Sequence, residues 1–139
     1  MTRFTGPVLL LLVTLCVSSA EDTDILVVRY QQKSMALARG SSVKLSCEAN
    51  YDLEQCGLVH VVWCHTSKQG AELTDPRKYL TTVNETETAG SMRRRQVVTE
   101  ILQLTREDNG EFQCKAQCEK GASAMGHFIR LTVRGRSPE

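Results

Sequence analysis

The sequence has little of what marks several protein classes. Neither charge sign is in clear excess, because 17 lysines and arginines stand against 16 aspartates and glutamates, so charge favours neither nucleic acid nor an anionic membrane as a partner. Aromatic residues are few (one Trp, three Tyr and three Phe), and a small core of this kind usually depends on covalent cross-links outside the cell. After residue 20 no apolar run is long enough to suggest a membrane span.

The longest apolar run lies at the N-terminus and predicts a cleaved secretory leader. An arginine near the start precedes the run over residues 8–13, and small residues come just before two acidic ones. This is the pattern of a signal peptide over residues 1–20. We therefore expect one domain over residues 21–135 and a polar tail over 136–139. The product would be secreted, or exposed at the cell surface if the chain is the head of a longer anchored receptor.

Alternation with a period of two residues dominates the rest of the chain. Val43, Leu45 and Cys47 fall on one face of a short run, for example, with polar residues between them. Short alternating runs separated by Gly-containing polar breaks are typical of strands and turns. The pattern predicts an all-β fold, a two-sheet antiparallel β-sandwich with seven or more strands. The expected strands include residues 25–28, 43–47, 59–63, 97–104, 111–116 and 127–133.

Three residues favour an immunoglobulin-like sandwich. In that fold a cysteine on the second strand bonds one on the sixth, and a tryptophan on the third strand packs against the bridge. Cys47, Trp63 and Cys114 each lie in an expected strand. A Cys47–Cys114 bridge would contribute roughly 4 kcal/mol by the chain-entropy estimate.

The residues before Cys114 resemble the Asp-x-Gly-x-Tyr-x-Cys signature of variable-type immunoglobulin domains. Asp108 is expected to form a structural ion pair with one of the arginines at 93–95. Phe112 stands where the signature has tyrosine, so its ring can pack in the core but cannot donate the usual hydrogen bond. The missing bond would cost about 1 kcal/mol.

Removal of the leader leaves five cysteines, an odd number. In an immunoglobulin fold the third and sixth strands run antiparallel, which places Cys118 opposite Val59 and near the loop that contains Cys56. We therefore predict a second bridge, Cys56–Cys118, worth roughly 3 kcal/mol at most. Cys64 is left single and points outward, because its neighbour Trp63 points inward. It is either a buried thiol at a sheet edge or the site of an intermolecular disulfide.

The sequence offers no support for a metal site or for catalysis. His60 and Cys64 are four residues apart on one strand, a separation of about 13 Å, and no Cys-x-x-Cys pair is present. Cys64 and His65 have no orienting carboxylate or oxyanion donor nearby in the sequence. We expect no metal, no cofactor and no enzymatic activity.

A single sequon, Asn84-Glu85-Thr86, predicts N-glycosylation at Asn84. It falls in a polar stretch between expected strands, which we interpret as an exposed loop.

Within the variable-type domains, the sequence resembles the ectodomain family of B- and T-lymphocyte attenuator, an inhibitory lymphocyte co-receptor. The similar elements are a loop cysteine at Cys56, the Trp63-Cys64 pair and the run from Asp108 to Cys114. The resemblance covers most of residues 24–134. It departs in cysteine pairing, since the family's partners for the loop cysteine and for the Trp-Cys cysteine are missing here, while Cys118 is new.

The resemblance implies a protein ligand of the tumour-necrosis-factor-receptor type. It would be held by the edge strand near the N-terminus and by the region after the sixth strand. An exposed strand edge can bind a partner through main-chain hydrogen bonds, although residues 25–28 could equally well pair only within their own sheet. The candidate contact residues are Ile25, Val27, Arg29, Lys115 and Gln117.

Two functions follow from these patterns. The first is an extracellular immune-type recognition module, a soluble or truncated inhibitory co-receptor. The alternative is a structural subunit that is joined to a membrane partner by an intermolecular disulfide through Cys64.

Overall fold

A computed structural model describes residues 25–30 and 33–135 of the chain, which form a β-sandwich. The leader predicted over residues 1–20 and the tail over 136–139 lie outside the described residues. The strands are β1 (Leu26–Arg29), β2 (Lys33–Ala38), β3 (Val43–Asp52), β4 (Val59–His65), β5 (Ala71–Glu72), β6 (Tyr79–Ala89), β7 (Met92–Ile101), β8 (Gly110–Cys118), β9 (Ser123–Met125) and β10 (Ile129–Arg134). Three short helices connect them: α2 (Leu53–Cys56), η2 (Thr66–Lys68) and η3 (Arg106–Asp108).

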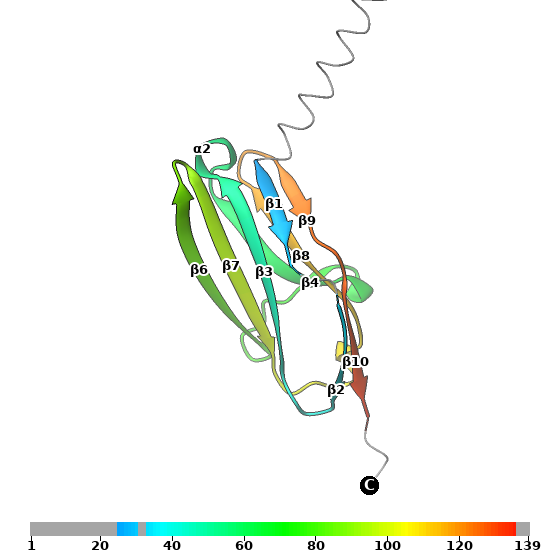
Figure 1. The fold of residues 1–139 in the computed structure, drawn as a ribbon. Coiled ribbons are helices and arrows are strands. Elements are labelled where there is room, and N and C mark those ends of the chain that lie inside the picture. Colours follow the sequence, from blue (N-terminus) through cyan, green and yellow to red (C-terminus); the bar gives the residue numbers. More distant parts are fainter. Residues whose placement is uncertain (1–24, 31–32, 136–139) are drawn as a thin grey trace, which may run out of the picture.

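The first sheet has four antiparallel strands in the order β1-β3-β7-β6 (Figure 1). Its edges differ greatly in length, because β1 has 4 residues and β6 has 11. Residues in β3 alternate strictly between buried and less buried positions, which is the pattern of a strand with one face on a core.

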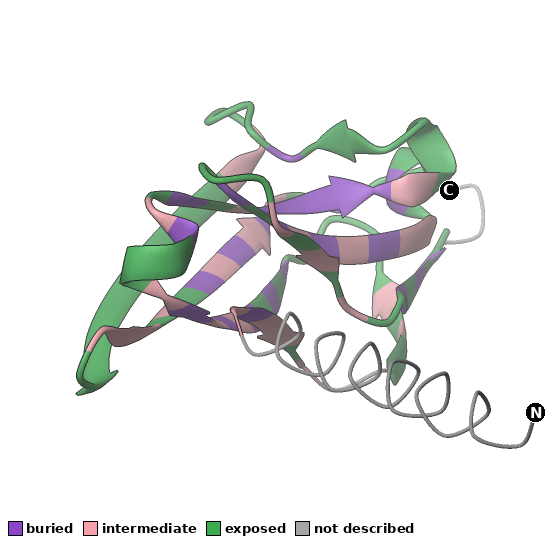
Figure 2. Ribbon diagram, turned by 90° about the horizontal axis from the view of Figure 1, so that it is seen from above, coloured by how far each residue is buried: buried purple, intermediate pink, exposed green. Residues whose placement is uncertain are grey.

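The second sheet contains six strands, in the order β2-β10-β8-β4-β5, with β9 paired to β8. Its pairs are antiparallel except for β2 and β10, which run parallel. The two sheets face each other, and Figure 2 shows buried and exposed residues alternating along their strands. The all-β two-sheet prediction is therefore confirmed.

The core between the sheets consists of two groups of buried side chains. One surrounds Trp63, which is fully buried together with Leu45, Phe112 and Leu131. The other lies nearer the α2 end and contains Leu26, Tyr51 and Ala116. Each group contains a disulfide. Cys47–Cys114 joins the two sheets beside Trp63, and Cys56–Cys118 joins the end of α2 to the end of β8.

The sequence prediction was incomplete for several strands. It gave no strand over β2, β5, β6 or β9, and it began β7 five residues too late, at residue 97 instead of Met92. β6 is exposed along almost its whole length. It therefore has no alternation of apolar and polar residues, and this alternation was the signal used to find strands.

Candidate protein-binding site

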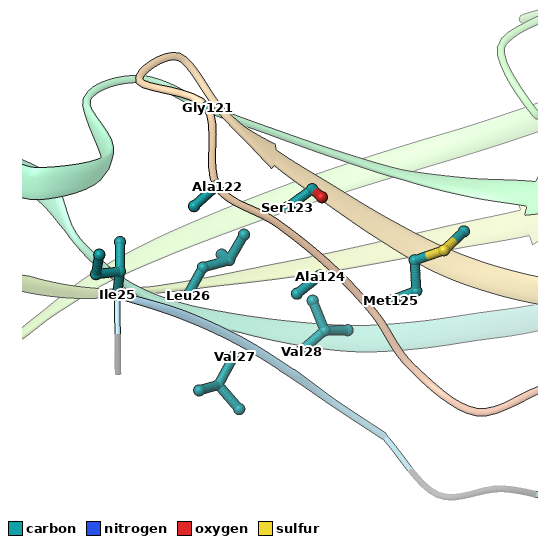
Figure 3. A pocket seen from close by; sticks show the side chains of 9 residues that line it. All are labelled: Ile25, Leu26, Val27, Val28, Gly121, Ala122, Ser123, Ala124 and Met125. Carbon is teal, nitrogen blue, oxygen red and sulfur yellow. The ribbon is translucent and has the colours of Figure 1, made fainter. Parts of the chain in front are cut away.

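A groove runs between β1 of the first sheet and β9 of the second. Residues 25–28 line one side and residues 121–125 line the other, with a volume of about 710 Å³. Leu26 and Val28 point toward Ala124 across the groove, whereas Val27 points away from it (Figure 3). The lining side chains are apolar apart from Ser123, and we call this feature the β1–β9 groove.

Free main-chain groups face the groove from both sides. The carbonyl of Ile25 accepts a hydrogen bond from Asp52 N (3.0 Å), and antiparallel ladders alternate their bonding residues. Leu26 and Val28 therefore direct their N–H and C=O groups away from β3. On the other side, Cys118 N donates to Ala122 O (2.7 Å), and the same alternation turns the groups of Ser123 and Met125 away from β8.

Tyr30 closes the lower end of the groove. Its ring lies 4.9 Å from that of Trp63, and its hydroxyl accepts a hydrogen bond from Cys114 N (3.2 Å) while donating one to His127 O. Burial raises the pKa of this hydroxyl. A Cβ at Gly126 would collide with the Tyr30 ring, so glycine is required there. Sequence reasoning missed Tyr30, and the only signal for it was its place at the end of the first apolar run.

The upper end of the groove is fixed by covalent and hydrogen-bonded links between α2 and the β8–β9 turn. Besides Cys56–Cys118, Lys120 N donates to Cys56 O (3.0 Å) and Glu119 N donates to Leu58 O (2.7 Å). Glu119 Oε1 also accepts a hydrogen bond from Leu58 N (3.2 Å). The turn that carries one wall of the groove is thus held in place before any partner arrives.

Asp52 holds α2 in the position that this clamp needs. Its Oδ1 accepts hydrogen bonds from Ser91 Oγ (2.8 Å) and Glu54 N (3.0 Å), and it caps the helix N-terminus. The Ser91 hydrogen bond, followed by those from the helix N–H groups, holds the pKa of the Asp52 carboxyl below its usual value.

The structure brings the two predicted contact segments together at the groove but places their side chains on different faces. Val27 and Arg29 lie on the outer face of the first sheet, because Leu26 points into the core. Lys115 and Gln117 lie on the outer face of the second sheet, since Ala116 between them is buried. Ile25, at the start of the strand, lines the groove itself.

Cys64 is the free cysteine of the described residues, and it is buried at 3% exposure. It points outward as expected, since it is absent from both core groups, but Glu72, its partner on β5, and Lys115 lie close to it. Glu72 lies 3.8 Å from Lys115 and 3.7 Å from His60. Burial raises the pKa of the Cys64 thiol. An intermolecular disulfide would require this cover to move.

The expected partner of Asp108 is wrong. Asp108 pairs with Lys78, whose Nζ lies 2.8 Å from its Oδ2. Arg93 and Arg94 lie at the start of β7, at the opposite end of the sheet from Asp108. Because β6 and β7 are antiparallel, the start of β6 lies beside the end of β7. Lys78, just before β6, therefore lies near Asp108, which follows β7. Arg95 pairs with Glu85 instead, at 2.6 Å.

Two further sequence expectations need correction or detail. Asn84 is exposed as expected, but it lies within β6 and not in a loop. Phe112 is fully buried and its ring packs 4.1 Å from that of His65, which is itself 2% exposed. His65 Nε2 lies 3.3 Å from Glu107 O, and burial lowers the pKa of its imidazole.

Within the described part of the chain, no cluster of three or more His, Cys, Asp or Glu residues could hold a metal ion. None of the helices in residues 25–30 and 33–135 is long and apolar enough to cross a membrane.

Comparison with known proteins identifies the architecture. The family model described as "Immunoglobulin V-set domain" matches residues 30–134, well over half of the chain. A search of curated proteins found no match to the chain.

Proposed function

The chain belongs to the immunoglobulin V-set domain family, and we propose that it is an extracellular recognition module that binds a protein partner through the β1–β9 groove. V-set domains are typically recognition modules without enzymatic activity. The observation that carries the proposal is the groove itself, which combines an apolar lining with free main-chain groups on two strand edges.

An extended segment of a partner suits this combination. Strand addition uses main-chain hydrogen bonds for affinity and side-chain pockets for specificity. The groups of Leu26 and Val28, or those of Ser123 and Met125, offer such bonds. Apolar side chains on one face of the partner segment would pack on Ala122 and Ala124. The absence of acidic side chains from the lining favours apolar over basic contacts.

The rigid ends of the groove support affinity. Binding costs less when the site needs no ordering. Here Tyr30 is fixed by packing and two hydrogen bonds at one end, and Cys56–Cys118 fixes the turn at the other.

The finer part of the proposal comes from the resemblance to the B- and T-lymphocyte attenuator ectodomain. The partner would be a tumour-necrosis-factor-receptor-type protein at a cell surface, and the biological role would be that of an inhibitory co-receptor or a soluble form of one. Arg29, Lys115 and Gln117 would then contribute contacts at the rim of the groove.

Two matched pairs of variants test the site. Met125 is 56% exposed at the rim of the groove and Leu80 is 51% exposed on β6, so Met125→Glu and Leu80→Glu make the same change on two surfaces. Ser123→Pro removes a free N–H, whereas Ser123→Ala keeps it. The ligand panel should include tumour-necrosis-factor-receptor-type ectodomains and unrelated surface proteins.

We expect Met125→Glu and Ser123→Pro to weaken binding by about tenfold or more, as for a contact at the centre of an interface. Leu80→Glu and Ser123→Ala should bind as the wild type does. Equal loss with Leu80→Glu, or full binding by both groove variants, would place the interface elsewhere. If the domain bound only proteins outside the tumour-necrosis-factor-receptor class, and the groove variants weakened that binding, the groove would remain the proposed binding site. The proposed tumour-necrosis-factor-receptor-type partner would be rejected.

A further inference from the structure

The edge strand β6 differs from every other edge strand of the described sandwich. The other edges are short, with 4 residues in β1, 6 in β2, 2 in β5 and 3 in β9, whereas β6 has 11. A long unpaired edge is a template for pairing with another chain, and proteins usually guard one with lysine, proline or a bulge. Residues 79–89 contain neither lysine nor proline, and their irregular pairing lies at the far end, between Glu87 and Ala89.

The free main-chain groups of this edge can be assigned. Leu102 N donates to Lys78 O (2.9 Å), and the register continues with Leu80 opposite Glu100. By the alternation of an antiparallel ladder, Thr81, Val83 and Glu85 direct their N–H and C=O groups away from β7. Val83 also leaves 54% of its side chain exposed at this edge.

The charges along β6 fit a second copy of the same strand. Arg77 precedes the strand and Glu87 lies near its end, and their side chains are 89% and 81% exposed despite neighbours within the chain. Two antiparallel copies in the register that sets Thr81 opposite Val83 of the second copy also bring Arg77, in the turn just before the strand, toward the end of the second strand that carries Glu87. This happens twice, because the pairing is symmetric.

The glycosylation sequon lies at the middle of this edge. Asn84 is the sixth of the eleven residues of β6. Side chains two residues apart share a face, so Asn84 and Thr86 both lie on the exposed outer face, while Glu85 turns inward to bond Tyr51 and Arg95. Gln96, which pairs with Asn84 on β7, is also exposed and polar. A glycan here would have a polar side chain, that of Gln96, as its neighbour on β7.

We propose that an N-linked glycan on Asn84 blocks the free edge of β6 and prevents two copies of the domain from pairing through it. A bulky glycan attached to the outer face at the centre of this edge strand lies beside the space that the strand of a second copy would occupy, and its bulk would crowd that space in any symmetric register near the middle. The proposal goes beyond partner recognition, and it does not depend on which protein the β1–β9 groove binds.

The test compares the secreted chain with single-residue variants made in a eukaryotic host. Thr86→Ala destroys the sequon, and its matched control Thr86→Ser retains it. Sedimentation velocity over a wide concentration range measures the protein mass of each form. We expect a glycosylated monomer for the wild type and for Thr86→Ser, and a doubling of protein mass with rising concentration for Thr86→Ala.

Second changes in the Thr86→Ala background identify the surface that self-associates. Val83→Pro removes a free N–H of the edge and should restore the monomer. Glu87→Lys should weaken the dimer, and Arg77→Glu added to Glu87→Lys should strengthen it again. Met125→Glu should leave the dimer unchanged, which separates this edge from the groove.

The proposal is overturned if Thr86→Ala stays monomeric, if the wild type is secreted without a glycan, or if Met125→Glu and not Val83→Pro abolishes the dimer. Thermal unfolding of each variant must show a folded domain. If Thr86→Ala does not fold, Asn84→Gln replaces it, with the same expected doubling. The self-association test does not involve the β1–β9 groove. Its outcome therefore holds even if the groove variants show no effect on ligand binding.

Discussion

The ammonium group of Lys78 lies 2.8 Å from Oδ2 of Asp108, at the end of the sandwich where the chain passes from β7 to β8. The same Oδ2 accepts a hydrogen bond from Thr105 N (2.8 Å), and Lys78 Nζ also bonds Gln103 O (3.2 Å). Asp108 is almost completely buried, whereas Lys78 is about one quarter exposed. This pair therefore fixes the connection between the two sheets.

Lys78→Met should destabilise the domain by about 2 kcal/mol. The change leaves a buried carboxylate without its cation, a loss that is moderated by the partial exposure of Lys78. Urea unfolding measures the free energy. Arg94→Ala is the control, because Arg94 is exposed, and its effect should stay within about 0.5 kcal/mol. A larger decrease in the free energy of unfolding for Arg94→Ala than for Lys78→Met would contradict the Lys78–Asp108 pair and favour an arginine as the partner of Asp108.

Replacing both Cys56 and Cys118 by serine should lower the midpoint of thermal unfolding by on the order of 10 °C. The estimate follows from a bridge worth about 3 kcal/mol at most in a domain of this size. Peptide mapping of the wild type should recover Cys47–Cys114 and Cys56–Cys118. The thiol of Cys64 should react with alkylating reagents only after unfolding. Rapid alkylation of Cys64 in the native protein would contradict its burial.

Acid should destabilise the domain through His65. Burial lowers the pKa of this imidazole in the folded state, so the fold favours the neutral form. Its contribution to stability is complete above the unfolded pKa of about 6.5 and is lost as pH falls from there toward the folded pKa. Lys68 and Asp108 are the charged groups that influence this pKa, and the backbone carbonyl of Glu107 acts on it through a hydrogen bond.

The measurement is the free energy of unfolding of His65→Gln and of the wild type between pH 7.5 and pH 5.5, a range of about one unit on either side of the reference value. The decline toward acid should be smaller in His65→Gln. His60→Gln, a change at an exposed histidine, should decline as the wild type does. Identical profiles for all three proteins would exclude His65 as the cause.

Gly110→Ala should cost about 2 kcal/mol or more. Gly110 has a φ of +133°, and an added Cβ would lie 2.6 Å from Ser67 Oγ and 2.8 Å from His65 Cε1, so backbone strain and a clash add together. Gly40→Ala, at φ +88° with no atom within 4 Å of the new Cβ, isolates the backbone part. Thermal unfolding should show the larger loss for Gly110→Ala. Equal losses would mean that the loop around Ser67 moves aside.

Much of the fold could be predicted because a few residues constrain it strongly. Cys47, Trp63 and Cys114 determine which strands face each other, and the antiparallel register of β4 and β8 places Val59 opposite Cys118. That register brings Cys56 within reach of Cys118, with Cα atoms 4.9 Å apart. The second bridge was therefore predictable without any relative that has it.

Other features depend on relations that the linear sequence does not contain. Lys78 lies beside Asp108 because the pairing of β6 with β7 sets Tyr79 opposite Ile101, and the sequence does not reveal this register. Strand β6 carries polar residues on both faces, so apolar alternation could not detect it, although its threonines have high β-propensity. The groove needs the relative placement of β1 and β9 from two different sheets. From the sequence, Val27 was predicted to contact the partner. In the structure its side chain points away from the groove, and its neighbours Leu26 and Val28 direct both their side chains and their free main-chain groups toward it.

The Cys47–Cys114 bridge also governs how the domain responds to mechanical tension. A pull applied between β1 and β10 travels from residue 47 directly to residue 114 through the sulfur atoms. The intervening loop of chain, which contains β4 to β7, is bypassed and cannot lengthen while the bridge is intact. A domain with this bridge would stretch only through its outer segments, and a single cut inside the loop would leave both fragments attached.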